Sequence, residues 1–273
     1  MSSISRVLDI AGFETLKGKS AVVTGSTSGI GLGIAQAFAS AGINVAINGF
    51  GDASEIEASR AALEAAGVKA LYNPADMTKP EAINALISEA QEAFGAVDIL
   101  VNNAGIQYVE KVEDFPDAKW EAILAINLSS NFYAIKAALP GMKRRGYGRI
   151  INIASAHGLS ASPYKSAYVT AKHGVLGLTK TIALETAEEN ITVNAICPGY
   201  VKTPMVEGQI ADQAKAHNMT EDDVVREVML ARQPNKRFVD VDELAGLALF
   251  LCTEAGQSMT GRAISVDGGW TAM

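Results

Sequence analysis

The stretch Thr24-Gly25-Ser26-Thr27-Ser28-Gly29-Ile30-Gly31 decides the fold of this 273-residue chain. It lies between a short apolar run, Ser20–Val23, and a segment with helical periodicity, Gly31–Ala41. An open parallel sheet binds phosphate at such a turn, because glycine lets the backbone approach and the helix N-terminus supplies free N–H groups. A tight turn with no ligand is the alternative, so the prediction of a dinucleotide site rests on strand, turn and helix together.

Outward from this turn, strand-like and helix-like segments alternate, which predicts a parallel sheet covered by helices on both faces. The expected strands are Ser20–Val23, Val45–Asn48, Ala70–Asn73, Ile99–Asn102, Arg149–Ile153, Thr192–Cys197 and Ala263–Val266. The expected helices are Gly31–Ala41, Ser54–Ala66, Pro80–Phe94, Trp120–Met142, Ser166–Ala187 and Asp240–Leu251. We therefore predict a doubly wound, Rossmann-like α/β fold of about seven strands, in one domain over residues 16–273.

Two segments depart from the alternation. Residues 1–15 carry little pattern and are expected to form an N-terminal extension. Residues of about 198–235 form a long insertion after the sixth strand, with charged helical stretches such as Glu221–Glu227. An insertion of that length inside a compact domain is usually functional, so it is predicted to be a substrate lid.

The composition excludes several classes of protein. Hydrophobic residues make up 48% of the chain and charged residues 19%, without a long uninterrupted apolar run, which favours a soluble globular protein without a membrane span. The net charge of −7 opposes nucleic-acid binding. Cys197 and Cys252 lie in apolar segments and predict a reducing, cytoplasmic setting. Three histidines without ligand spacing predict no metal site.

The residues after the second expected strand bear on the choice of cofactor. An acid at this position normally holds the ribose of NAD, whereas an arginine accepts the 2′-phosphate of NADP. The sequence here is Asn48-Gly49-Phe50-Gly51-Asp52, with neither type at the strand end, so the missing cation favours NAD with Phe50 as an adenosine wall. Asp76 has two open interpretations, a contact with the adenine amino group or a cap for the helix near Pro80.

Asn102-Asn103-Ala104-Gly105 and Tyr168-x3-Lys172 complete a set of motifs with the glycine-rich turn. The set resembles the short-chain dehydrogenase/reductase family from about Leu16 to Met273. The resemblance implies hydride transfer to or from a nicotinamide, with Asn127, Ser155, Tyr168 and Lys172 as the catalytic residues. Together with the turn, it implies cofactor contacts from Gly25, Thr27, Ser28, Gly29, Ile30, Gly31, Met77, Asn103, Gly105, Leu128, Tyr168, Lys172, Pro198, Gly199, Val201 and Thr203.

The chemistry of an alcohol oxidation supports this assignment independently. A free tyrosine, with a pKa of about 10, is mostly protonated near neutrality and needs help to act as a base. Lys172 lies one helical turn beyond Tyr168, so its ammonium, together with the charge of an oxidised nicotinamide, is expected to lower the phenol pKa. Ser155 ends the fifth strand, where doubly wound sheets place ligand contacts. Asn127 is predicted to carry a water-mediated proton path to Lys172, the alternative being a surface asparagine.

Several polar and aromatic residues fall near this machinery. A cation with hydrogen-bond donors suits a small carboxylate substrate, and aromatic walls exclude water from it. The expected substrate contacts are Gln107, Ser155, His157, Lys165, Tyr168, Tyr200, Gln209 and Trp270.

Within the family, this set resembles the members that interconvert (R)-3-hydroxybutyrate and acetoacetate with NAD, which implies a homotetramer with contacts through the helix from Trp120 and the C-terminal strand. Tyr200 stands where those members have tryptophan. A 3-oxoacyl-thioester reductase or another hydroxy-acid dehydrogenase is the first alternative. A non-enzymatic nucleotide sensor is the second, since fold alone does not fix function.

Overall fold

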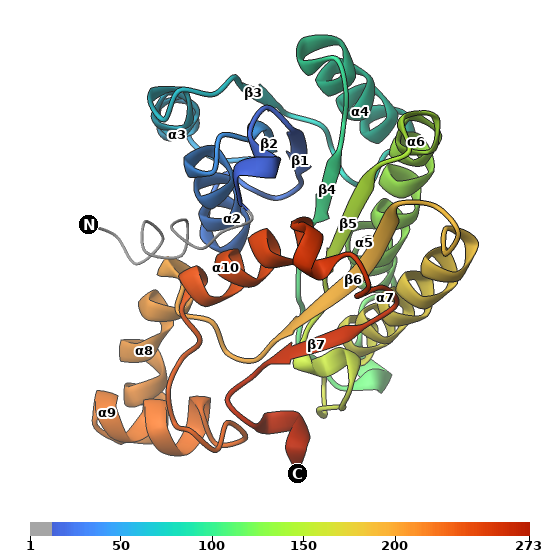
Figure 1. Cartoon of the computed structure of the whole chain (residues 1–273). Helices are drawn as coiled ribbons and strands as arrows, with labels where there is room; N and C mark the ends of the chain where they lie inside the picture. Colours follow the sequence, from blue (N-terminus) through green and yellow to red (C-terminus); the bar gives the residue numbers. More distant parts are fainter. Residues whose placement is uncertain (1–12) are drawn as a thin grey trace.

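The computed structural model describes residues 13–273, apart from the side chains of residues 204, 205, 209 and 216. Its centre is a parallel sheet in the order β3-β2-β1-β4-β5-β6-β7 (Figure 1). The strands are β1 (Ser20–Val23), β2 (Asn44–Asn48), β3 (Ala70–Asn73), β4 (Ile99–Asn102), β5 (Gly148–Ile153), β6 (Ile191–Pro198) and β7 (Ala263–Val266). The strand order reverses between β1 and β4, where doubly wound sheets bind their ligands.

Helices cover both faces of the sheet, which confirms the predicted fold class (Figure 1). They are α2 (Gly29–Ser40), α3 (Ala53–Ala65), α4 (Pro80–Phe94), α5 (Asp117–Leu124), α6 (Ser130–Arg145), α7 (Ser166–Glu185), α8 (Pro204–His217), α9 (Glu221–Val224) and α10 (Val241–Cys252). Successive strand residues point to opposite faces, so Val101 packs with α2 and α10, whereas Leu100 packs with α4, α6 and α7. The two apolar layers fix the sheet between the helices.

The expected single helix from Trp120 to Met142 is interrupted. Two α-helices, α5 and α6, are joined by a π-helical turn over Ala125–Ser129. A π turn inserts an extra residue into a helix and occurs mostly at functional sites. The combined helix over 117–145 is apolar and long enough to cross a membrane, but Ala134, Ile135 and Met142 are buried against the sheet as in a core helix.

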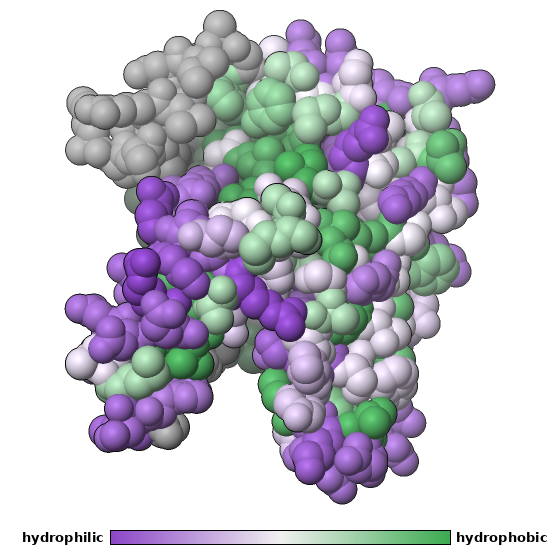
Figure 2. Space-filling model, turned by 90° about the horizontal axis from the view of Figure 1, so that it is seen from below, coloured by the Kyte–Doolittle hydropathy of each residue, from purple (hydrophilic) through white to green (hydrophobic). Residues whose placement is uncertain are grey.

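The insertion after β6 carries α8, α9 and a π-helical turn, Val225–Met229. Its neck is closed by a parallel bridge between Val201 and Val239, in which Lys202 N donates to Val239 O at 2.9 Å and Val239 N to Tyr200 O at 2.9 Å. The inserted unit therefore ends at Val239, beyond the expected residue 235. It lies beside the C-terminus, on the side of the molecule that is hollowed between two lobes when seen from below (Figures 1 and 2).

The N-terminal boundary differs slightly from the prediction. Most of the expected extension over residues 1–15 lies outside the described residues. A 3-10 helix begins at Phe13, and Phe13 and Leu16 are both buried in the core cluster with α2 and α10. Residue 13 therefore belongs to the domain.

Candidate active site

The glycine-rich turn between β1 and α2 is held against the loop after β4. Asn103 Nδ2 donates to Thr24 O at 3.0 Å and to Gly25 O at 2.8 Å. A Cβ atom on Gly31 would lie 2.5 Å from both Asn103 Nδ2 and Gly25 O, so only glycine fits this position. The turn and the Asn103–Gly105 segment, predicted separately as cofactor contacts, thus form one surface.

The start of α2 suits a phosphate group. Ser28 precedes the first turn of the helix without capping it through its side chain, and no acidic residue lies in that turn. The first N–H groups of the 12-residue helix are therefore left to a ligand, with the positive end of the helix dipole. Thr203 lies close by, since its methyl would be 3.7 Å from a Cβ at Gly29. This brings the start of the insertion after β6 to the glycine-rich turn.

The loop after β2 presents an open aromatic face. Thr27 Oγ1 donates to Phe50 O at 2.9 Å, which ties this loop to the glycine-rich turn. The Phe50 side chain is 69% exposed, as an adenosine wall requires. Asp52 is committed elsewhere, because its carboxylate caps α3 by accepting from Ser54 N at 2.8 Å and Glu55 N at 3.2 Å. A hydrogen bond from the Ser54 hydroxyl and, after it, these two backbone bonds lower the pKa of the Asp52 carboxyl.

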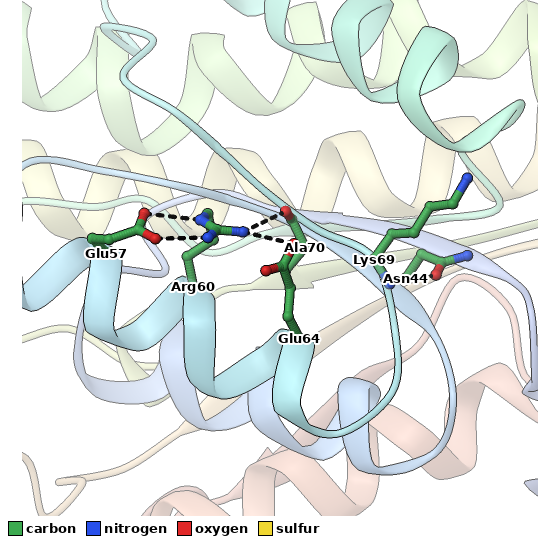
Figure 3. Close-up of polar contacts among 6 residues, drawn as sticks. All are labelled: Asn44, Glu57, Arg60, Glu64, Lys69 and Ala70. Atoms are coloured by element: carbon green, nitrogen blue, oxygen red, sulfur yellow. Dashed lines mark hydrogen bonds and ion pairs between the residues drawn. The ribbon is translucent and has the colours of Figure 1, made fainter.

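The basic residue of α3 is also engaged. Arg60 forms ion pairs of 2.6 Å with Glu57 and 2.7 Å with Glu64, and its guanidinium also donates to Ala70 O at 3.4 Å (Figure 3). The Lys69 side chain extends away from this cluster (Figure 3). Arg60 therefore holds α3 against β3 and is not presented as a cation for a 2′-phosphate.

Of the two interpretations of Asp76, the cap of the helix near Pro80 is wrong, while the contact with the adenine amino group stays a prediction. Its carboxylate accepts from Thr78 N at 2.9 Å and Thr78 Oγ1 at 2.8 Å, and these bonds lower its pKa. The residue that caps α4 is Lys79, so Asp76 shapes the turn before the helix instead of capping it. Met77, a predicted cofactor contact, is buried in the cluster under α4.

The two motif residues of α7 lie beside the end of β5. Lys172 is 4% exposed, and its Nζ donates to Ile153 O at 2.7 Å and lies 5.6 Å from the centroid of the Tyr168 ring. Burial lowers the pKa of Lys172 to about 8. Ser155 lies just after β5, separated from it by Ala154, and its hydroxyl is close enough to Tyr168 to act on the phenol. Three of the four predicted catalytic residues are therefore brought together.

The depression of the Tyr168 pKa, expected from Lys172 together with an oxidised nicotinamide, stays a prediction, because the protein groups alone do not produce it. Burial raises the pKa of Tyr168, and the hydrogen bond from Ser155 only opposes this shift. Spacing on a helix indicated the neighbouring cation but not the loss of water around the phenol. The positive charge of an oxidised nicotinamide would favour the phenolate at this position.

Asn127 lies in the π-helical turn and is fully buried, so the surface alternative is wrong. Its amide pairs with one backbone unit: Oδ1 accepts from Ile106 N and Nδ2 donates to Ile106 O, both at 2.9 Å. These bonds hold the loop after Gly105 in place, while the proton path to Lys172 stays a prediction. The Leu128 side chain packs against Gly174 of α7.

Aromatic rings enclose the substrate side of Tyr168. His157 is 5% exposed and makes edge contacts with Tyr168 at 5.9 Å and Trp270 at 5.0 Å between ring centroids. Tyr200 stacks on Trp270 at 6.2 Å. Burial lowers the pKa of His157, and Lys165 lies close enough for its charge to lower it further. Burial and then Arg232 lower the pKa of Lys165.

Two other predicted substrate contacts, Gln107 and Gln209, stay predictions. Gln107 is exposed on the loop after β4. The side chain of Gln209, on α8, lies outside the described residues. Within the part of the chain that the structure describes, no group of three or more His, Cys, Asp or Glu residues is arranged to hold a metal ion.

The sequence profile described as Enoyl-(Acyl carrier protein) reductase matches residues 25–271. This match spans the glycine-rich turn from Gly25, the Tyr168–Lys172 motif and the insertion after β6. The chain belongs to the short-chain dehydrogenase/reductase family. It is thus an oxidoreductase with the NAD(P)-binding fold of that family.

Curated relatives in the family are similar over nearly the whole chain. The D-beta-hydroxybutyrate dehydrogenase of Rhizobium meliloti is 57% identical over 257 residues, which cover 93% of this chain and 99% of the relative. The D-beta-hydroxybutyrate dehydrogenase of Cupriavidus necator is 52% identical, with 94% and 99% covered. A solved structure described as a short-chain alcohol dehydrogenase of Sinorhizobium meliloti is 34% identical with a TM-score of 0.84, covering 97% of this chain and 99% of that one.

Two residues of this short-chain dehydrogenase escaped the sequence analysis. Arg232, at the end of the lid, donates to Ala161 O at 2.7 Å and lies 6.0 Å from the Trp270 ring. It lines a pocket of about 630 Å³ beside Trp270, together with residues that include Leu159 and Met273. Gln233 is fully buried, and its Oε1 accepts from Tyr200 N at 3.0 Å. Each of these residues contacts a partner more than 30 positions away in the sequence, and no local pattern indicates such contacts.

Gln233 also explains the Pro198-Gly199 turn. A Cβ on Gly199 would lie 2.4 Å from Gln233 Oε1 and 3.0 Å from Asp267 Cα, so a side chain is excluded there. The predicted cofactor contact Val201 is 7% exposed and packs in the core cluster at the neck of the lid. The turn after β6 is thus fixed between the lid and the C-terminal segment.

Proposed function

We propose that this chain is an NAD-dependent dehydrogenase that interconverts (R)-3-hydroxybutyrate and acetoacetate. The observation that carries the proposal is the series of ring contacts from Tyr168 through His157 to Trp270 and Tyr200, with Lys165 as a nearby cation. Such a site suits a short acid with a carboxylate near the reacting carbon. The names of the two curated relatives support the same substrate.

In the oxidation, the substrate hydroxyl gives its proton to Tyr168 Oη while the carbon–hydrogen electron pair leaves as hydride. A bound nicotinamide would accept that hydride. Ser155 donates a hydrogen bond to the reacting oxygen, and Lys172 places positive charge beside the phenol. The Gly25–Gly31 turn would hold the pyrophosphate and Phe50 the adenosine.

NAD is proposed over NADP because Asp52 caps α3 and Arg60 is paired with Glu57 and Glu64. A 2′-phosphate would be bound there without a charged partner, and a hydrogen bond to a charged group contributes about 1.5–3 kcal/mol. We expect kcat/KM with NAD to exceed kcat/KM with NADP at least tenfold, which corresponds to about that free energy. The test is NADH or NADPH formation at 340 nm over a panel of 2- and 3-hydroxy acids.

The same assay tests the second candidate, a reductase of 3-oxoacyl thioesters. The description of the matched profile favours it, since that description names an acyl carrier protein reductase. Faster turnover of acetoacetyl thioesters with NADPH than of 3-hydroxybutyrate with NAD would replace the first proposal with the second. Slow turnover of every substrate in both directions would favour the non-enzymatic alternative, a nucleotide sensor.

Lys165 is proposed to bind the substrate carboxylate. Replacing Lys165 with alanine is expected to raise KM for the hydroxy acid about tenfold or more, because one charge-assisted hydrogen bond is lost. KM for NAD should change less than twofold. Lys180→Ala is the matched control, since Lys180 is an exposed lysine on α7. Equal increases in both KM values for Lys165→Ala would instead indicate a damaged fold.

The remaining proposals concern the setting of the enzyme. The buried free thiols of Cys197 and Cys252 are compatible with a reducing, cytoplasmic compartment.

Contacts in a homotetramer are supported by two exposed rings, Trp120 on α5 at 37% and Phe132 on α6 at 45%. The outer edge of β7, which pairs with no other described strand, supports the same assembly. Sedimentation of the purified chain at a monomer mass would exclude that assembly. The segment from Pro198 to Val239 is proposed as the lid over the substrate.

A further inference from the structure

A chain of polar contacts runs from the end of the lid to the catalytic serine. Arg232 NH1 donates to Ser162 Oγ at 3.1 Å, and Ser162 Oγ lies 2.8 Å from His157 Nε2. On the other side of the ring, His157 Nδ1 lies 3.5 Å from Ser155 Oγ. Ser155 Oγ also accepts from His157 N at 3.1 Å and bonds Tyr168. Arg232 and Ser162 are thus connected to the reacting group through one imidazole.

The chemistry of arginine indicates which groups donate and which accept along this series of polar contacts. A guanidinium can only donate, so Ser162 Oγ must be the acceptor in its bond to Arg232. The Ser162 hydroxyl then has its own hydrogen available for the short contact with His157 Nε2. In a neutral imidazole one nitrogen accepts and the other carries the hydrogen. If Nε2 accepts from Ser162, Nδ1 carries the hydrogen and points it toward Ser155.

The surroundings of His157 keep the ring neutral, which makes the position of its single hydrogen decisive. The ring is packed against Tyr168 and Trp270. Three groups that carry or can take positive charge face it, Lys165, Arg232 and His173. Burial first and these neighbours second lower the pKa of His157 to about 4.

We propose that Arg232 and Ser162 are positioning residues, which hold His157 as the Nδ1–H tautomer and thereby direct the Ser155 hydroxyl hydrogen to the reacting oxygen. A serine oxygen has two lone pairs and one hydrogen. The N–H and Nδ1–H groups of His157 occupy the two lone pairs, so the Ser155 hydrogen remains for Tyr168 or the substrate oxygen. With the opposite tautomer, a bare Nδ1 would compete for that hydrogen. The proposal rests on the proposed function only for the identity of the substrate.

The tautomer can be observed directly in the wild-type protein without substrate. The full chain, labelled with ¹⁵N in its three histidines, is measured by two-dimensional NMR at neutral pH. The signals of His157 are identified by their absence from a His157→Gln protein. We expect the shift of a protonated nitrogen for Nδ1 and of a bare nitrogen for Nε2. The reverse pattern, or averaged shifts, overturns the proposal whether or not the proposed substrate is turned over.

Substitutions test the consequence for catalysis. Ser162→Ala is expected to release the tautomer preference and to lower kcat about tenfold, the effect of one hydrogen bond, with KM for NAD unchanged. Ser160→Ala is the matched control, since the Ser160 hydroxyl bonds Ala156 O in the same loop. Ser162→Thr and Arg232→Lys keep a hydroxyl and a donor and should retain most of kcat, whereas Arg232→Met should behave as Ser162→Ala.

A Ser162→Ala protein with wild-type kcat and an unchanged His157 spectrum overturns the proposal. A fall in kcat without a change of tautomer also overturns it, since the serine would then act in another way. If Ser162→Ala does not fold, by circular dichroism, the wild-type spectrum and the Arg232→Met protein decide the question.

Discussion

Replacing Tyr168 with phenylalanine is expected to lower kcat about 10²- to 10⁴-fold, the contribution of a positioned acid–base group. The substitution removes the phenol oxygen, which is proposed to exchange a proton with the substrate oxygen next to Ser155. Phenylalanine keeps the edge contact with His157 at 5.9 Å, so the packing of the site should survive. The measurement is kcat for hydroxybutyrate oxidation and for acetoacetate reduction.

The control for this substitution lies four residues away on the same segment. Tyr164 is 56% exposed, and Tyr164→Phe should leave kcat within twofold of the wild type. NAD affinity, followed by NADH fluorescence, should be unchanged in the Tyr168→Phe protein. Retention of more than a tenth of the wild-type kcat would show that another group carries the proton, and the assignment of Tyr168 would fail.

The centre of the sheet was predictable because β1, β4, β5 and β6 are short, largely apolar runs that are buried on both faces. Ile150 and Ile151 face opposite clusters, and each run ends in a residue that breaks the pattern. The phosphate turn was predictable for a similar reason, since Gly31 has no room for a Cβ atom. In both cases the requirement, an apolar strand or a position without a side chain, is visible in a few neighbouring residues of the sequence.

The substrate side was less predictable, because it depends on contacts between distant segments. Arg232 meets Ser162 and Trp270 across the molecule, and nothing near Arg232 in the sequence indicates them. The π turn around Asn127 leaves the helical pattern almost unchanged, so a single helix was expected. Burial is likewise a property of the whole fold. It raises the pKa of Tyr168, a shift that the spacing of Tyr168 and Lys172 on a helix does not indicate.

Replacing Lys172 with methionine is expected to reduce kcat by at least about 10², because the positive charge beside the Tyr168 phenol is lost. The same change should stabilise the fold at neutral pH. Lys172 is buried with a pKa of about 8, below its ordinary value of 10.5. Below pH 8 the folded protein therefore carries a buried charge at a cost of up to about 3 kcal/mol, which methionine avoids.

The sign of the pH dependence follows from this depressed pKa. Between about pH 8 and 10.5 the folded protein has released the Lys172 proton while the unfolded chain still holds it, so wild-type stability gains with rising pH. The methionine protein lacks this gain. The difference in unfolding free energy between the two proteins, measured in urea from pH 7 to 10, should shrink toward zero as pH rises. Taking the difference removes the titrating groups that lie away from Lys172, such as Cys252, which both proteins share.

Lys180→Met separates burial from the loss of a lysine as such, because Lys180 is exposed on the same helix and its replacement should leave both kcat and the pH profile unchanged. A Lys172→Met protein that is less stable than the wild type at pH 7 would mean that the bond from Nζ to Ile153 O outweighs the desolvation of the charge. The expected opposite changes in stability and turnover follow from one fact. The charge that assists the phenol is held in a position where the fold would be more stable without it.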